Sequence, residues 1–132
     1  METNVDDCTG EMLGFVMEQL LDQGALDVFF TSIFMKKNRP AYRLTVVCKE
    51  KQMESLQKII FTHTTTIGIR YRKEQRTILE RKIKEIDTPL GKLQVKEVLI
   101  DGEKRCYPEY ESAKKLALEH HCSLQEIYHF VK

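Results

Sequence analysis

The periodicity of the apolar positions predicts two helices in the first half of the chain. Leucine, valine and methionine recur every three or four positions over residues 9–24, and a similar pattern covers residues 50–61. Gly24 follows the first run, where glycine commonly caps the end of a helix, and either Asp7 or Thr9 is expected to cap its start. Each predicted helix therefore has one apolar face that a sheet or another helix must cover.

Alternating and β-branched residues predict strands around these helices. The runs ALDVFFTSIFM and YRLTVVC flank the turn sequence KKNRP, which predicts an antiparallel hairpin. Val5 lies in a short opening strand, and IGIRYR, residues 67–72, predicts a closing strand. The order strand, helix, strand, strand, helix, strand is that of a ferredoxin-like βαββαβ domain, which we place at residues 1–77.

A second, smaller domain is predicted at residues 78–132. The runs TILERKIKEI and KLQVKEVLI are joined by DTPLG, which predicts a β-hairpin, and the DG pair at 101–102 marks a further turn. Pro108 is expected in the first turn of a helix, and Ser123 with Glu126 forms a capping box for the last helix. The predicted fold class is α+β, a ferredoxin-like domain followed by a small domain of a β-hairpin and helices.

Composition narrows the class of protein without deciding its function. Of the 132 residues, 42% are hydrophobic, which is enough for a core, and a net charge of +1 gives no basic field for nucleic acid. No apolar run is long enough for a transmembrane helix, and the acidic start METNVDDCTGE is unlike a secretory signal peptide. Four cysteines occur without a CxxC pair. We therefore expect reduced thiols in a cytoplasmic protein with no membrane or nucleic-acid partner.

The stretch THTTTIGIRYR carries candidate phosphate-binding groups. Its threonines offer hydroxyl and backbone N–H groups, and Gly68 leaves the backbone open to close approach. Arginines at alternate positions add charged donors, and such groups together bind a phosphate chain. The alternative is a solvated strand entry with an exposed basic face. The candidate phosphate ligands are Thr64, Thr65, Thr66, Arg70 and Arg72.

The turn KKNRP adds Lys36, Lys37 and Arg39, three cations in four residues. They are either further phosphate ligands or a solubilising hairpin tip. The ferredoxin-like topology leaves open whether this turn lies near the threonines of the same chain or near those of another subunit.

Two acidic stretches give weaker signals. Asp6 and Asp7 adjoin the start of the first helix, where they either bind a hard cation such as Mg²⁺ or simply complement the helix dipole. Glu109 and Tyr110 either start a helix or, in the case of the tyrosine, stack on a base. No GxxxxGK[ST] or GxGxxG motif is present, so the ordinary nucleotide-binding signatures are absent, and no catalytic residue is assigned.

The blocks ETNVDD, GALDVFFTSIFMKKNRPAYRLTVVC, TTTIGIRYR, TPLGKLQVK and PEYE follow one another along the chain. Together they resemble the C-terminal half of the nickel-insertion proteins of nickel-pincer cofactor biosynthesis, the LarC family. The resemblance covers essentially all 132 residues, and the MKKNRP and TTTIGIR blocks are its specific motifs.

The resemblance implies an activity and a set of ligands. Such proteins are metal chelatase-type lyases that insert nickel into pyridinium bisthiocarboxylic acid mononucleotide and convert CTP to CMP and pyrophosphate. The C-terminal half would carry the CTP site, with Mg²⁺ or Mn²⁺ on the triphosphate, and would assemble as a trimer or hexamer. Asp6 or Asp7 would lie near the cation. The basic turn and the threonine–arginine stretch would lie near the phosphates.

This sequence lacks the N-terminal domain of the family, which often carries a histidine-rich stretch suited to nickel. The resemblance therefore implies a partner, the N-terminal half of the same protein or a separate chain. Two other functions stay open at this point. One is a non-catalytic nucleotide-binding regulatory module, by analogy of fold. The other is an oligomerisation domain whose basic residues are only solvated surface.

Overall fold

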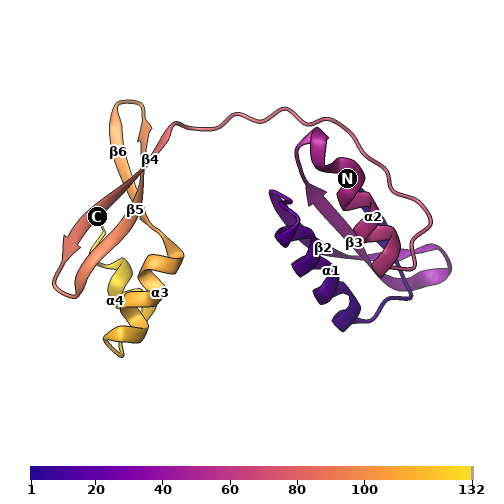
Figure 1. The fold of residues 1–132 in the computed structure, drawn as a ribbon, viewed down its shortest axis with the longest axis horizontal. Helices are drawn as coiled ribbons and strands as arrows, with labels where there is room; N and C mark the ends of the chain where they lie inside the picture. Colours follow the sequence, from indigo (N-terminus) through magenta and orange to yellow (C-terminus); the bar gives the residue numbers. More distant parts are fainter. Residues whose placement is uncertain (132) are drawn as a thin grey trace. The chain divides into compact units, whose positions relative to one another are not determined.

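The chain forms two compact units in a computed structural model that describes residues 1–131. The first unit spans Met1–Glu74, and the second begins at Gln75 (Figure 1). Each unit has its own antiparallel sheet, its own helices and its own hydrophobic core. The predicted α+β fold class is confirmed.

The first unit packs two helices against one face of a three-stranded sheet. The strand order is β1-β3-β2, and both pairings are antiparallel. Val16 of α1, Leu56 of α2 and Leu44 of β3 are fully buried in the shared core. The elements are β1 (Glu2–Val5), α1 (Gly10–Asp22), β2 (Asp27–Met35), a 3-10 turn (Lys36–Asn38), β3 (Arg39–Val47), a second 3-10 turn (Glu50–Gln52) and α2 (Met53–His63).

The capping signals predicted for the first helix are confirmed. The Thr9 hydroxyl accepts a hydrogen bond from the Met12 N–H at 3.2 Å, which caps the start of α1. Gly24, just beyond the end of α1, has a φ of +94°, a conformation that glycine adopts without strain. The Gln52 side-chain amide donates to the Gly24 carbonyl at 2.9 Å. The end of α1 is therefore tied to the start of α2.

β2 and β3 form the predicted hairpin. Met35 pairs with Arg39, and the chain turns through Lys37 and Asn38, which have φ values of 62° and 56°. Asparagine tolerates this left-handed conformation better than most residues. Lys36 and Lys37 of this turn are exposed to solvent at one end of the sheet.

The predicted closing strand at residues 67–72 is wrong. Of these residues, all of which the structure describes, only Arg70 pairs with the sheet, in an isolated antiparallel bridge to Glu2 with N···O distances of 2.8 and 3.0 Å. The Thr3 hydroxyl donates to the Gly68 carbonyl at 2.9 Å, so an acceptor that a regular ladder would use is already occupied. The bridge stands beside β1, where the fourth strand of a ferredoxin-like sheet would lie. The ferredoxin-like order is kept, with its last strand reduced to one residue pair.

The second unit packs two short helices on a three-stranded antiparallel sheet of order β4-β5-β6. Leu93 of β5, Ala113 of α3 and Ile127 of α4 are fully buried together. The elements are β4 (Arg81–Thr88), β5 (Gly91–Ile100), β6 (Glu103–Pro108), α3 (Tyr110–Glu119) and α4 (Leu124–Tyr128).

The strand β6 is an addition to the predicted hairpin. Pro108 ends this strand instead of entering the first turn of a helix, and α3 begins at Tyr110 with Glu109 as its N-cap residue. β6 lies at the edge of the sheet, where proline is tolerated because one side of the strand needs no partner. The predicted turn before β6 is confirmed, since Asp101 and Gly102 have φ values of 50° and 83°.

The predicted capping box of α4 is also confirmed. The Glu126 N–H donates to the Ser123 hydroxyl at 3.2 Å, and the Ser123 N–H donates to the Glu126 carboxylate at 2.7 Å. The Ser123 N–H, and after it the Ser123 hydroxyl, which donates to the same carboxylate at 2.9 Å, lower the pKa of Glu126 below its ordinary value. None of the helices within residues 1–131 is both long enough and apolar enough to cross a membrane.

Candidate functional site

The acidic end of β1 meets the threonine turn that follows α2. Asp7 follows the end of β1, and Thr65 follows α2, 58 positions later in the sequence. The Thr65 hydroxyl donates a hydrogen bond to Asp7 Oδ1, and Cys8 Sγ lies 3.4 Å from the same hydroxyl oxygen. The side chains of Asp7 and Thr65 are both exposed. A carboxylate and a hydroxyl are thus presented to solvent at one point.

The neighbouring threonines are engaged within the fold. The buried Thr64 hydroxyl donates to the Ile60 carbonyl at 2.7 Å and closes the end of α2. The Thr66 hydroxyl lies 2.6 Å from that of Thr3 and donates to the Gly68 carbonyl at 3.0 Å. These bonds hold the turn in shape, and they leave Thr65 as the threonine of the three with an exposed side chain.

The basic turn lies at the same end of the sheet as this junction. Arg39, the first residue of β3, donates from Nη1 to Asp6 Oδ2 at 3.0 Å. Because Asp6 adjoins Asp7, this ion pair places the KKNRP turn and the threonine turn of one chain around the same acidic segment. Lys36 and Lys37 stand exposed in the turn. The basic turn therefore lies near the threonines of its own chain, and no second subunit is needed to bring them together.

Arg70 and Arg72 lie on the face of β1 that points away from the helices. Thr3 and Val5 are buried, and strand side chains alternate, so Glu2 and Asn4 point away from the helices. Arg70 donates from Nε to Glu2 Oε2 at 3.1 Å and from Nη2 to the Asn4 side-chain oxygen at 2.8 Å. Arg72 Nη1 lies 3.4 Å from the same Glu2 oxygen.

The hydrogen bond from Arg70 holds the pKa of Glu2 below its ordinary value, and Arg72 acts in the same direction. The hydrogen bond from Arg72 to Glu74, and after it the bond to Glu2, raise the pKa of Arg72. Both arginines are therefore neutralised by carboxylates, and a phosphate would have to replace those carboxylates.

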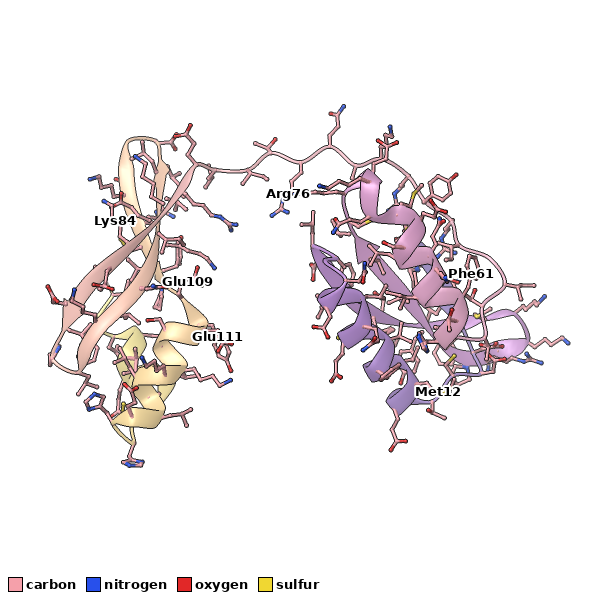
Figure 2. The ribbon with its side chains drawn as sticks, in the orientation of Figure 1. Met12, Phe61, Arg76, Lys84, Glu109 and Glu111 are labelled. Carbon is pink, nitrogen blue, oxygen red and sulfur yellow. The ribbon has the colours of Figure 1, made fainter. Side chains whose placement is uncertain are left out.

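Glu109 and Tyr110 belong to the second unit, where β6 meets α3 (Figure 2). Glu109 pairs with Lys96 at 3.0 Å. The Lys114 ammonium lies 5.7 Å from the centre of the Tyr110 ring, within the range of a cation–π contact. The structure therefore gives both residues partners within their own unit.

A cavity of about 450 Å³ lies beside the threonine turn and was not predicted. Phe15 of α1 and His63 of α2 line it, with ring centroids 5.2 Å apart in an edge-to-face arrangement. Met12, which lies near the start of α1 (Figure 2), and Thr65 also contribute to its wall. Met12 and Phe15 lie three positions apart and outside the core face of α1, and this spacing is the sequence signal for the cavity.

The carboxylates of Asp6 and Asp7 suit a cation that is bound together with a phosphate ligand. Within residues 1–131, no group of three or more histidine, cysteine, aspartate or glutamate side chains is arranged to hold a metal ion. Mg²⁺ commonly takes one or two protein carboxylates and completes its shell with phosphate and water oxygens. Asp6 and Asp7, adjacent and at the surface of the same segment, fit that pattern.

Residues 1–128 match the family model described as nickel insertion protein. The chain belongs to this family. The resemblance to LarC proteins inferred from the sequence blocks is thereby confirmed.

The curated relatives of the chain carry names that state an activity. A protein of Alkaliphilus metalliredigens named pyridinium-3,5-bisthiocarboxylic acid mononucleotide nickel insertion protein is 50% identical over 128 residues, which are 97% of this chain and 30% of the relative. A protein of the same name from Acetivibrio thermocellus is 48% identical and is matched over 97% of this chain and 31% of its own length. The chain thus spans about a third of these relatives.

Two solved structures share the fold. LarC2, described as the C-terminal domain of a cyclometallase involved in the synthesis of the NPN cofactor of lactate racemase, superposes with a TM-score of 0.91 at 46% identity, over 97% of this chain and 89% of that one. A protein from Methanopyrus kandleri superposes with a TM-score of 0.70 at 20% identity, over 98% of this chain and 81% of that one. The second likeness concerns the fold alone.

Proposed function

We propose that the chain is the CTP-binding, C-terminal part of a nickel insertase that acts on pyridinium bisthiocarboxylic acid mononucleotide and forms the nickel-pincer cofactor. The observation that carries the nucleotide site is the contact between Asp7 and Thr65. Together with the ion pair of Asp6 and Arg39, it gathers carboxylate, hydroxyl and guanidinium groups at one end of the first sheet. These are the groups that a triphosphate and its divalent cation require.

In the first unit, different residues bind the phosphates and the divalent cation. Lys36, Lys37 and Arg39 offset the phosphate charge. When the cation takes the Asp7 carboxylate, the Thr65 hydroxyl turns from Asp7 and donates its one hydrogen bond to a phosphate oxygen. Asp6 and Asp7 hold Mg²⁺ or Mn²⁺, which, when bound, neutralises phosphate charge and so favours loss of pyrophosphate from CTP. Thr64 and Thr66 keep the threonine turn in the shape that exposes Thr65.

The remaining predicted ligands have supporting roles in this proposal. Arg70 and Arg72 become phosphate ligands when the triphosphate displaces the Glu2 carboxylate from them. Glu109 and Tyr110, in the second unit, are proposed as nucleotide ligands on the resemblance of the PEYE block alone. Nickel and the mononucleotide precursor are substrates, and their identity is supported by the names of the relatives.

The insertion step is assigned to the assembled protein. The chain spans about a third of its curated relatives, so it supplies the nucleotide-binding step. The N-terminal half, on the same protein or a separate chain, takes part in the lyase reaction. We place this assembly in the cytoplasm as a homo-oligomer, a trimer or a hexamer, with no nucleic-acid or membrane partner.

Calorimetric titration of the chain with CTP, and with ATP, in the presence of Mg²⁺ tests the proposal. We expect CTP to bind more tightly than ATP. The variants Asp7→Asn and Arg39→Ala should each weaken CTP binding about tenfold or more, because each removes a charged partner of the ligand. Lys58→Ala is the matched control, since Lys58 is exposed on α2 and makes no ion pair with any residue of the described range 1–131. Equal affinity for both nucleotides, or wild-type affinity in Asp7→Asn, would contradict the proposed site.

A further inference from the structure

Thr3 places a hydroxyl at a strand position where packing favours an apolar residue. Thr3 and Val5 are the two buried residues of β1, and their side chains are 2% and 3% exposed. Valine has nearly the shape of threonine and carries no polar group that loses water on burial. A buried hydroxyl is stable only when it has a hydrogen-bond partner inside the fold.

The partner of Thr3 is the threonine turn, 63 positions later in the chain. The Thr3 hydroxyl oxygen lies 2.6 Å from the Thr66 hydroxyl oxygen and 2.9 Å from the Gly68 carbonyl oxygen. The Thr66 hydroxyl oxygen lies 3.0 Å from the same carbonyl, so the three oxygens form a closed triangle that the two hydroxyl hydrogens serve. Side chains therefore join β1 to the turn, in addition to the backbone bridge between Glu2 and Arg70.

The hydrogen bonds continue from this triangle to the end of α2. The Thr66 N–H donates to the Thr64 hydroxyl at 3.3 Å, and the Thr64 hydroxyl donates to the Ile60 carbonyl at 2.7 Å. Thr65 lies between these two threonines in the chain. Both neighbours of Thr65 are thus held, one by α2 and the other by Thr3 of β1.

The direct contact between β1 and Thr65 is the one that a nucleotide would break. The end of β1 and the turn now meet through the hydrogen bond from the Thr65 hydroxyl to Asp7. A cation on the carboxylate and a phosphate on the hydroxyl would each take one partner of that bond. The hydrogen bonds of Thr3 involve neither of these two groups.

We propose that Thr3 is a positioning residue of the nucleotide site, which keeps Asp7 and Thr65 at the spacing that one Mg²⁺–triphosphate requires. This inference rests on the proposed function, because it names the residue that holds the two halves of that site together once the ligand separates them. Thr3 is buried and does not touch the ligand, and its effect passes through Thr66 and Gly68.

Titration of the full chain with CTP in the presence of Mg²⁺ tests the role of the hydroxyl. Thr3→Val should raise the dissociation constant about fivefold or more, because the spacing of the two segments is no longer fixed. Thr3→Ser keeps the hydroxyl and should bind within about twofold of the wild type. Val28→Ala is the matched control. Val28 is buried in the same unit on β2, so this variant loses stability without a change in the turn and should keep the wild-type affinity.

A double variant shows whether the effect passes through Thr66. Thr66→Val should also weaken CTP binding, and adding Thr3→Val should weaken it little further, because either substitution alone removes the contact between the two hydroxyls. Additive losses would overturn the proposal. Wild-type affinity in Thr3→Val, or an equal loss in Thr3→Ser, would overturn it as well.

Amide hydrogen exchange without nucleotide separates this inference from the proposed function. The Thr66 N–H is bonded to Thr64, and the Gly68 N–H donates to the Thr66 hydroxyl at 3.4 Å. Both amides should exchange several-fold faster in Thr3→Val and at the wild-type rate in Thr3→Ser. Unchanged rates in Thr3→Val would overturn the positioning role alone. A wild type that binds no CTP, with exchange rates as expected, would overturn the nucleotide site and leave Thr3 as a residue that only fixes the turn.

Discussion

The carboxylate of Glu2 holds two arginines at once. Its Oε2 lies 3.1 Å from Arg70 Nε and 3.4 Å from Arg72 Nη1, and the hydrogen bond from Arg70 lowers the pKa of Glu2 below the ordinary 4.5. A carboxyl whose pKa is lower in the folded protein stabilises the fold above its unfolded pKa. That contribution is lost as the pH falls through the folded pKa.

The variant Glu2→Gln is therefore expected to lower the free energy of unfolding at pH 7 by about 0.2–1 kcal/mol, the range of surface ion pairs. The difference between wild type and variant should shrink as the pH falls below 4.5, because the wild-type carboxylate then becomes protonated too. Urea unfolding at a series of pH values measures it. Glu18→Gln, on the exposed face of α1 and without an ion pair to any described residue, should show no such trend. A difference that persists unchanged to pH 3 would show that the lost interaction is not ionic.

The candidate site shows what a sequence reveals at the scale of residues. The residue types of the acidic, basic and threonine segments suggest a cation and a phosphate chain. The contact of Asp7 with Thr65 could not be derived, because 58 positions separate the two residues and only the fold brings them together. Nor does residue type distinguish Thr65 from Thr64, whose hydroxyl is used to close a helix.

At the scale of elements, periodic patterns predicted the helices and the first hairpin, and the capping residues predicted where helices begin and end. The predictions failed in two situations. In one, a side-chain hydrogen bond takes a backbone group that a strand would use. In the other, a residue that suits a helix start equally suits the edge of a sheet. The run IGIRYR alternates as a strand should, yet Thr3 occupies the Gly68 carbonyl and leaves a single bridge. Pro108 suits a helix start in sequence terms, but it also suits the end of an edge strand such as β6.

Two glycines of the α1 region should respond in opposite ways to alanine. At Gly24, with a φ of +94°, an added Cβ would lie 2.5 Å from Gln52 Nε2, so Gly24→Ala should lower the free energy of unfolding by about 1–2 kcal/mol. At Gly14, inside α1, an added Cβ would meet no described atom within 4 Å beyond its chain neighbours and the backbone of the helix itself. Gly14→Ala should therefore raise that free energy by about 0.5–1 kcal/mol. Chemical denaturation of both variants measures the shifts, and equal signs would contradict the assignment of the helix end.

At the scale of the whole molecule, the two hydrophobic cores are separate. Leu44 is fully buried in the core of the first unit, and Leu93 is fully buried in that of the second. We propose on this basis that residues 1–77 and 78–132 are domains that fold independently. Removing a buried leucine side chain costs about 2–5 kcal/mol, which is comparable to the whole stability of a small domain.

Leu93→Ala should consequently unfold the second unit and leave the first intact. Two-dimensional amide NMR spectra should lose the dispersed signals of residues from Gln75 onward and keep those of Met1–Glu74. Leu44→Ala is the reciprocal variant and should give the opposite pattern. Loss of both sets of signals in either variant would show one cooperative unit.

The bridge between Glu2 and Arg70 imposes an order on events during synthesis. β1 leaves the ribosome before the other strands of its own sheet, but its outer partner lies 68 positions later in the chain. The β2–β3 hairpin needs only a short loop and can form as soon as it emerges, whereas closure of a loop as long as that between β1 and Arg70 is slower. The nascent chain therefore carries its opening strand half-paired until almost the entire first unit has been translated.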